Sequence, residues 1–430
     1  MRTDRIAAAV FACALPFAAL AAEQKITFHK NVEPILQARC QACHRPGEAA
    51  PMSLLTYSDA RPWAKAIKQA VLTKKMPPWS ADGSVGHFRN DRRLSQEEIE
   101  TLSQWVDSGA VEGNMKDAPA PLKFAEGWAI GKPDAVLGMS KPFDIPAQGT
   151  LDYQWILIPG FQEDKWIQAF EVRPGNRAIV HHVAAFWRRK GSPWMADAQP
   201  GVPIAKPSSA PETGSSDGII AEYVPGIPPL ALPKGYAMKL PVGADIMLQV
   251  HYTPNGKATT DQSSVGFVFA SAPPENQVIT YGMAAPMLKI PPYEANYRAQ
   301  ANASFGVDVR LLGINPHMHL RGKSSEITLT YPDGRKETLL NVPKYDFNWQ
   351  ITYEPAGDLT LPAGTRLEAV SYYDNSPNNP FNPDPSKEVH WGDQTSDEMM
   401  AVFMHIAFPA NMDPRALFRR PAYPPKPSAE

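Results

Sequence analysis

Apolar residues in the first quarter of this 430-residue chain recur at helical spacing. One run places them three or four positions apart, which predicts a helix with a single buried face: Ile99, Leu102, Trp105 and Val106. A capping box at residues 95–98, Ser-Gln-Glu-Glu, precedes this run, and Gly109 follows it. Both ends of the helix are therefore marked in the sequence.

Beyond residue 125 the apolar residues alternate with polar ones in short runs that Pro and Gly interrupt, which is typical of β-sandwiches. Over residues 312–321 the even positions are apolar, and the odd positions carry the polar residues Asn315, His317, His319 and Arg321. Because alternate side chains of a strand share a face, His317 and His319 are expected side by side on a polar face.

Two further runs place potential ligands on strands. Over 247–252, His251 shares its face with Met247 and Gln249, opposite three apolar residues. Over 397–406, the even positions form an unbroken apolar face, so Met399 lies on the other face with Phe403 and His405.

His181 and His182 are adjacent in the sequence. Neighbouring strand residues point to opposite faces, so these two could share an ion only at a bulge or a strand end. The sequence pattern does not reveal such a bulge.

The distribution of proline supports this division of the chain, and the net charge limits the partners that we expect. Of the 45 prolines, seven precede residue 111, so the front tolerates helices and the remainder is rich in turns. Lys and Arg number 42 against 44 Asp and Glu, a net charge of −2. With no overall basic charge, we expect no nucleic-acid partner.

The first 22 residues have the pattern of an export signal. Arg2 and Arg5 precede an apolar run over 6–20, and small residues follow at 19–22. We expect cleavage there, a periplasmic or secreted protein, and no transmembrane anchor after cleavage. The alternatives are an uncleaved anchor and lipidation at Cys13.

Cys40-Gln41-Ala42-Cys43-His44 is the C-x-x-C-H pattern of covalent c-type haem attachment. The two thiols would bond the haem vinyl groups, and His44 would be the proximal iron ligand. Met76, before two prolines, is the best candidate for the sixth ligand, with Met52 and His87 as alternatives. A redox disulfide is the other interpretation of the two cysteines.

Residues 24–112 resemble a class I cytochrome c domain. The resemblance rests on the C-x-x-C-H motif, on a helix expected over 34–42 before it, and on Phe28, Ile35 and Leu36 as core residues. A Pro- and Ala-rich linker is expected over 113–124.

The histidines beyond the linker suggest metal binding. A thioether beside two imidazoles favours copper, particularly Cu(I). Each residue taken alone has an ordinary explanation: an H-x-H pair is commonly solvated, a lone histidine such as His251 is commonly a core residue, and Met399 could simply pack.

Taken in order, four motifs resemble the type II copper, ascorbate-dependent monooxygenases, the family of peptidylglycine α-hydroxylating and dopamine β-monooxygenases. The motifs are His-His-x-x-x-Phe (181–186), Leu-Gln-Val-His-Tyr (248–252), His-x-His-Leu-x-Gly (317–322) and Asp-Glu-Met (397–399).

The resemblance implies two all-β jelly-roll sandwich domains, over 125–280 and 281–420. With the small all-α cytochrome c domain before them, we expect a multidomain fold, and we expect a disordered tail over 421–430. The sandwiches would face each other across a solvent-filled cleft. One copper would be held by His181, His182 and His251 and would supply electrons. The other would be held by His317, His319 and Met399, where O2 and a small-molecule substrate react. With one haem c, the cofactors would be two copper ions and a haem that an external donor reduces.

This chain also departs from the family. Asn315 stands where the peptide-hydroxylating enzyme has an arginine, and Phe403 where it has a tyrosine, so an amidated-peptide substrate is not expected. Arg310 or Arg321 could bind an anion instead. The insertion over 191–236 could cover the cleft, although a solvated loop is the simpler expectation.

The alternative functions are a non-catalytic copper-binding or electron-transfer protein and a haem-bearing adhesion or ligand-binding module.

Overall fold

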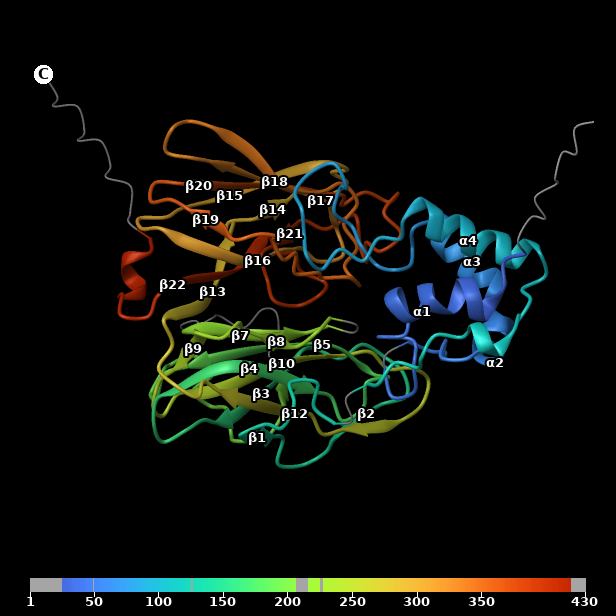
Figure 1. Cartoon of the computed structure of the whole chain (residues 1–430). Coiled ribbons are helices and arrows are strands. Elements are labelled where there is room, and N and C mark those ends of the chain that lie inside the picture. Colours follow the sequence, from blue (N-terminus) through green and yellow to red (C-terminus); the bar gives the residue numbers. More distant parts are fainter. Residues whose placement is uncertain (1–24, 49, 125–126, 206–215, 225–226, 419–430) are drawn as a thin grey trace, which may run out of the picture.

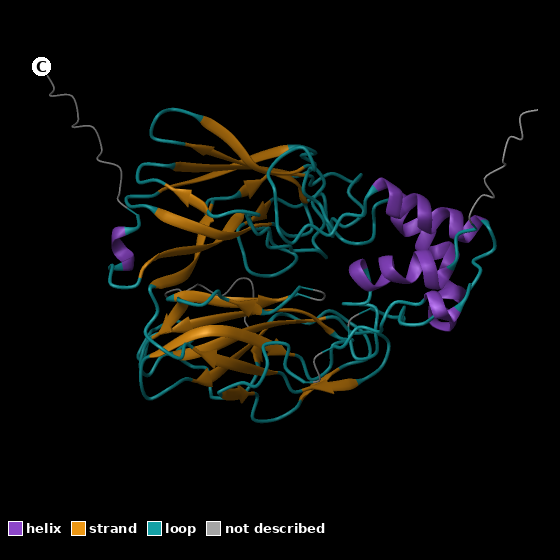
Figure 2. Cartoon of the chain, in the orientation of Figure 1, coloured by secondary structure: helices purple, strands orange, loops and turns teal. Residues whose placement is uncertain are grey.

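The structure is a computed structural model that describes residues 25–48, 50–124, 127–205, 216–224 and 227–418. The expected signal peptide, Cys13 and the expected tail over 421–430 lie outside these residues. Helices come first and strands follow, as Figures 1 and 2 show. In the described residues no helix is long and apolar enough to cross a membrane.

The front of the chain folds as a small helical unit, drawn blue to cyan in Figure 1. Its elements are η1 (Phe28–Val32), α1 (Glu33–Arg39), α2 (Tyr57–Ala60), η2 (Arg61–Trp63), α3 (Ala64–Leu72), α4 (Gln96–Asp107) and η3 (Met115–Asp117).

The helix predicted from the capping box is confirmed. Ser95 Oγ accepts a hydrogen bond from Glu98 N at 3.1 Å, and Glu98 Oε2 accepts one from Ser95 N at 2.7 Å. Trp105 is fully buried in the helical core, and Gly109 follows the helix with φ +94°. The helix expected over 34–42 ends earlier than predicted, at Arg39, and is α1 in the structure. Phe28 and Leu36 are fully buried in the core of the helical unit, as expected.

The remainder is almost entirely β-structure and forms two sandwiches. The strands of the first are β1 (Ala135–Gly138), β2 (Phe143–Ile145), β3 (Gln154–Pro159), β4 (Lys165–Arg173), β5 (Val180–Arg188), β6 (Ile204–Ala205), β7 (Gly218–Tyr223), β8 (Leu230–Ala231), β9 (Tyr236–Leu240), β10 (Asp245–Tyr252), β11 (Thr259–Asp261) and β12 (Ser264–Phe269). One layer has the order β1-β12-β4-β9, and the other has the order β6-β3-β10-β5-β7. An apolar core fills the space between these layers.

The second sandwich contains β14 (Lys289–Ile290), β15 (Tyr297–Ser304), β16 (Val309–His317), β17 (Gly322–Thr330), β18 (Lys336–Val342), β19 (Leu359–Leu361), β20 (Arg366–Tyr373), β21 (Val389–His390) and β22 (Ala401–Pro409), followed by η4 (Pro414–Ala416). Its layers are β15-β20-β17-β18 and β22-β16-β19, with the larger apolar core between them.

Strand β13 (Asn276–Ala284) joins the two sandwiches. It pairs with β7 and β9 of the first and along its whole length with β22 of the second. Val278 lies in the first core and Met283 in the second. The boundary expected at residue 280 therefore falls inside a shared strand.

The alternation expected over 312–321 is interrupted by a bulge in β16 between Leu311 and Gly313. Leu311 belongs to the second core, whereas Leu312 packs against the first core. Leu312 therefore contacts an apolar core, as its even position predicted, but the bulge shifts the phase of the strand by one residue and turns it to the other core.

The helical unit contacts both sandwiches (Figure 1). Trp79 and Phe88 pack against the second core, with the Trp79 ring 4.9 Å from that of Tyr353. On the first sandwich, Arg177 forms an ion pair with Glu48. The linker segment lies against α1, where Gln37 Nε2 donates to Ala120 O at 3.1 Å.

The insertion over 191–236 is not simply a solvated loop. It contributes β7, which lies between β5 and β13, and Trp194, which is 5% exposed. Residues 206–215 and 225–226 of this insertion lie outside the described part.

Candidate metal centre

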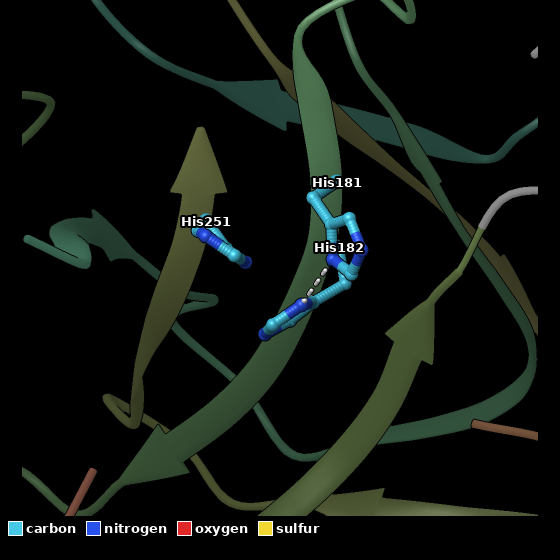
Figure 3. Close-up of side chains that lie close together, drawn as sticks. All are labelled: His181, His182 and His251. Carbon is cyan, nitrogen blue, oxygen red and sulfur yellow. Dashed lines mark hydrogen bonds between the residues drawn. The ribbon is translucent and has the colours of Figure 1, made fainter. Parts of the chain in front are cut away.

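His181, His182 and His251 come together on two neighbouring strands of the first sandwich. Their candidate ligand nitrogens all lie within 4.8 Å of one another. His182 on β5 is paired directly with His251 on β10, and the next pair is Val180 with Tyr252. His181 is therefore the extra residue of a β-bulge, which turns two adjacent histidines toward the same point (Figure 3).

Burial keeps this histidine cluster uncharged. It lowers the pKa of His251 to about 3 and that of His182 well below its ordinary value, and the neighbouring histidines lower the His182 pKa further. The pKa of His181 is also lowered by burial. His251 Nδ1 is buried and has no hydrogen-bond partner in the described structure. A neutral imidazole with an unused nitrogen is the form that binds a metal ion.

His317 and His319 lie side by side at the end of β16, with ring centroids 5.2 Å apart. The strand ends at His317, so His319 belongs to the turn beyond it rather than to the strand that the alternation predicted. The polar face is also buried rather than solvated: His319 is 2% exposed. Burial lowers the pKa of His317 to about 4 and that of His319 well below its ordinary value.

The hydrogen bonds of these two histidines leave nitrogens available. His317 Nδ1 donates to Gln350 Oε1 at 2.8 Å, which leaves Nε2 with its lone pair. The Gln350 amide is oriented by its Nε2, which donates to Phe347 O at 3.3 Å. His319 Nδ1 is buried without a partner among the described residues. Both rings thus offer a nitrogen in the neutral form.

Glu398 connects His319 to Met399. Its Oε1 accepts from the backbone N–H groups of His319 and Met399, and its Oε2 accepts from that of Arg321 at 2.9 Å. Glu398 is fully buried, and burial raises its pKa to about 7. One carboxyl group therefore holds the loop that bears His319 against the segment that bears Met399. This segment precedes β22, which begins at Ala401 rather than at residue 397.

Phe347 lies between the two ligand sets. Its ring stacks on that of His181 at 5.5 Å with an interplanar angle of 11°, and it meets the His319 ring at 6.0 Å. It is also 6.5 Å from the ring of His251. A residue of the second sandwich thus contacts ligands of both sets.

Two cavities lie where the sandwiches meet. The first, here called the metal-side cavity, has a volume of about 420 Å³ and is lined by His182, His317, His319, Met399 and aromatic residues including Tyr153. The second, the outer cavity, has a volume of about 490 Å³ and is lined by residues including Leu312, Pro229 and His405. Glu222, Gln350, Thr280 and Phe403 are among the residues that line both.

The C-x-x-C-H motif lies at the end of α1. His44 Nδ1 lies 3.3 Å from Met52 O, an arrangement that leaves His44 Nε2 for an axial bond. Met52, one of the alternatives for the sixth ligand, thus contacts His44 through its backbone carbonyl. His87 is exposed, in a segment whose backbone bonds to the second sandwich. Met76 follows α3, and its side chain is half-buried.

The cysteines do not have the character of a redox pair. Burial raises the pKa of Cys40 to about 12, and burial also raises that of Cys43. Redox-active C-x-x-C thiols have a lowered pKa, because the thiolate is the reactive form. The raised pKa values of both thiols differ from those of redox-active pairs.

Both arginines named as possible anion sites have partners in the structure. Arg321 is 2% exposed, and its side chain donates to Asn375 Oδ1 at 2.9 Å and to Ser396 O at 3.0 Å. Arg310 lines the outer cavity but forms an ion pair with Asp358 at 2.5 Å. Both side chains are committed to structural contacts.

Several residues of the site were not anticipated from the sequence. Phe347, Gln350, Glu398 and Tyr153 each contact a candidate ligand or its backbone, and none of them stands in a repeating pattern of the sequence. Tyr153 packs on both His182 and His251, at 5.4 and 4.9 Å. The one signal that could have pointed to Glu398 is its place beside Met399 in the Asp-Glu-Met motif.

No protein family model matches the chain, and no curated protein matches it in sequence. Among solved structures it is similar to the major capsid protein P2 of bacteriophage PM2, at 10% identity over 64% of this chain and 98% of that chain, with a TM-score of 0.28. It is also similar to VP2 of infectious bursal disease virus, at 11% identity over 66% and 74%, with a TM-score of 0.19. At these TM-scores the similarities carry no inference about this chain.

Proposed function

We propose that the chain is an exported haem–copper oxidoreductase, a copper-dependent monooxygenase that inserts one oxygen atom of O2 into a C–H bond of a small molecule. The proposal includes a cytochrome c domain at the front and a jelly-roll form for the two sandwiches. The observation that carries it is the presence of two neutral ligand sets, three histidines and two histidines with a methionine, in contact with one another through Phe347.

The donor chemistry supports copper at both positions. His251 Nδ1 and His319 Nδ1 are buried and have no hydrogen-bond partner among the described residues. A buried polar atom without a partner carries a free-energy cost that a metal ion would remove. Imidazole suits copper, and a thioether added to two imidazoles favours Cu(I). Bound copper would supply one-electron chemistry and O2 activation at the set that includes Met399.

The residues around the candidate ligands hold them in position. Gln350 holds the His317 ring through Nδ1, Glu398 holds His319 and Met399 together, and Tyr153 packs against His182 and His251. Aromatic residues, Tyr153, Trp155 and Phe403 among them, line part of the metal-side cavity. Insertion of one oxygen atom releases the other as water and consumes two electrons and two protons.

The helical unit would supply the electrons. Its contacts with both sandwiches, through Trp79 and Glu48, hold the C-x-x-C-H motif beside the β-structure. A donor that is part of the same chain has a high effective concentration at its acceptor. An external donor would then reduce the haem rather than enter the cavity.

Metal analysis of the exported protein tests this proposal. We expect one covalent haem and two coppers per chain, and O2 consumption that rises when a substrate is supplied. Zinc at both positions with no copper affinity would refute the copper assignment. Two bound coppers without oxygenation of any substrate would favour the non-catalytic electron-transfer alternative.

A further inference from the structure

The outer cavity is not needed to hold the metal ligands, although it adjoins the cavity that they line. Its walls come from all three units: the segment after β7, strands β16 and β22, and Arg89 of the helical unit. Most of the surface is apolar, with Ile227, Pro229, Leu312 and Leu359 among the lining residues. Leu312 faces this region because the β16 bulge turns it away from the second core.

Two hydrogen-bond acceptors meet where the cavities join. Glu222 lines both cavities, and its enclosure raises its pKa to about 7. Asn315 is 2% exposed, and its Nδ2 lies 3.5 Å from both Glu222 Oε2 and Gln350 O. Asn315 Oδ1 is buried without a partner in the described structure. The reverse orientation of the amide would place Oδ1 against two acceptors, so the observed one is favoured.

The charges around the outer cavity are otherwise balanced. Arg89 pairs with Glu354 at 2.5 Å, and Arg310 pairs with Asp358 at 2.5 Å. Glu222 is thus the ionisable side chain at the junction without an oppositely charged partner among the described residues. A ligand carboxylate or phosphate would meet a like charge there and find no free guanidinium.

We propose that the two cavities together bind an elongated, largely apolar molecule whose N–H or O–H group donates to Glu222 at the junction. Its apolar tail occupies the outer cavity beside Leu312, and its other end reaches the metal-side cavity near His317 and Met399. The substrate class is therefore an apolar amide, alcohol or amine whose donor group is flanked by apolar segments, without a carboxylate or phosphate. This inference rests on the proposed function, because it takes the metal-side cavity as the place of reaction.

A matched set of probes tests the donor group. N-benzylhexanamide and benzyl hexanoate have nearly the same shape, and only the amide has an N–H donor. We expect isothermal titration of the purified full-length chain, without added metal, to show the amide binding about tenfold more tightly than the ester. 6-Phenylhexanoate should bind more weakly than either. Equal affinities for the amide and the ester, no binding of either, or a preference for the carboxylate would overturn the proposal.

Substitutions test where in the two cavities the amide probe binds. Glu222→Leu should remove the preference for the amide, whereas Glu222→Gln keeps an acceptor oxygen and should retain it. Leu312→Ala should weaken the amide and the ester by the same factor, because both place an apolar tail there. A Glu222→Leu protein that keeps the preference refutes the assignment. If this variant does not fold, as judged by its thermal unfolding, the Leu312→Ala comparison still decides whether the outer cavity is occupied.

Copper analysis is independent of these titrations. A chain that binds two coppers but shows no amide preference would refute the substrate class and leave the proposed function standing. A chain that shows the amide preference but binds no copper would refute the proposed function and leave the ligand class of the cavities standing.

Discussion

The ring of Phe347 lies flat against that of His181, with centroids 5.5 Å apart, and the same phenylalanine meets His319 of the other ligand set at 6.0 Å. Phe347 is 9% exposed, so solvent does not separate it from either histidine. The two candidate copper sites are therefore linked by one packed side chain that belongs to the second sandwich.

This contact predicts magnetic coupling between the metals. In the copper-loaded, oxidised protein we expect the Cu(II) electron paramagnetic resonance spectrum to be broadened by dipolar coupling. Phe347→Ala removes the shared contact and should leave both the broadening and the copper content unchanged, because dipolar coupling acts through space and depends on the distance between the two metals. Phe381→Ala is the control, because Phe381 is 62% exposed. An uncoupled spectrum in the wild type would contradict the closeness of the two sites.

Met399 should determine the affinity of its site for Cu(I). Met399→Ile removes the thioether but keeps an apolar side chain, so we expect an unchanged fold, one copper retained at the three histidines, and a weaker second Cu(I) site. Competition with a Cu(I) chelator measures both affinities. Met287→Ile serves as the control, since Met287 is 91% exposed. Unchanged affinities in the Met399 variant would remove it from the ligand set.

Glu398 should be important for stability as well as for the site. Glu398→Gln keeps one carbonyl oxygen but replaces the other acceptor with an amide that faces backbone N–H groups. Leaving buried donors unpaired costs about 1–3 kcal/mol in the free energy of unfolding. Urea unfolding measures this loss, and Cu(I) affinity at the Met399 site should fall with it. A variant as stable as the wild type would mean that the three hydrogen bonds contribute little.

His405 should make the protein less stable in acid. Burial lowers its pKa to about 4, and its Nδ1 lies 3.1 Å from Thr280 Oγ1. An unfolded chain would bind a proton at the ordinary histidine pKa near 6.5, so the contribution of His405 is full above that pH. It is lost as the pH falls toward 4, by up to about 1.4 kcal/mol per pH unit.

A comparison of His405→Gln with the wild type isolates this effect. Glu222, in the same cavity, has a raised pKa and contributes stability with the opposite dependence on pH. The difference in unfolding free energy between variant and wild type should shrink between pH 7 and pH 5. A difference that does not change with pH would show that His405 has the same pKa in the folded and unfolded states.

The electron path can be tested without knowing the substrate. When the fully reduced protein is mixed with O2 in a stopped-flow instrument, we expect haem oxidation to be slower in a variant carrying His181→Ala and His182→Ala. His390→Ala is the control, because the side chain of His390 is 61% exposed and pairs with Glu388. Equal rates in all three proteins would mean that the haem does not deliver its electrons through this site.

Local patterns were sufficient to predict much of the architecture. The capping box of α4, the burial of Leu36 before Cys40, and the facing of His251 opposite the apolar residues of β10 all follow from spacing along the chain. These features depend on neighbours within a few residues, and the periods of helices and strands are built into the backbone. The division into a helical front and a β-rich remainder is visible for the same reason.

Features that depend on pairing between distant segments were not predictable in this way. The bulge at His181 exists because β5 pairs with β10, about 70 residues away, with one residue more on its side. The outward turn of Leu312 arises likewise from the pairing of β16 with β22. Phe347, Glu398 and Glu222 reach the site from loops or strands whose own spacing carries no signal. Their roles follow from burial. A buried acceptor needs a hydrogen-bond partner, and the tertiary fold determines which residue lies close enough to be that partner.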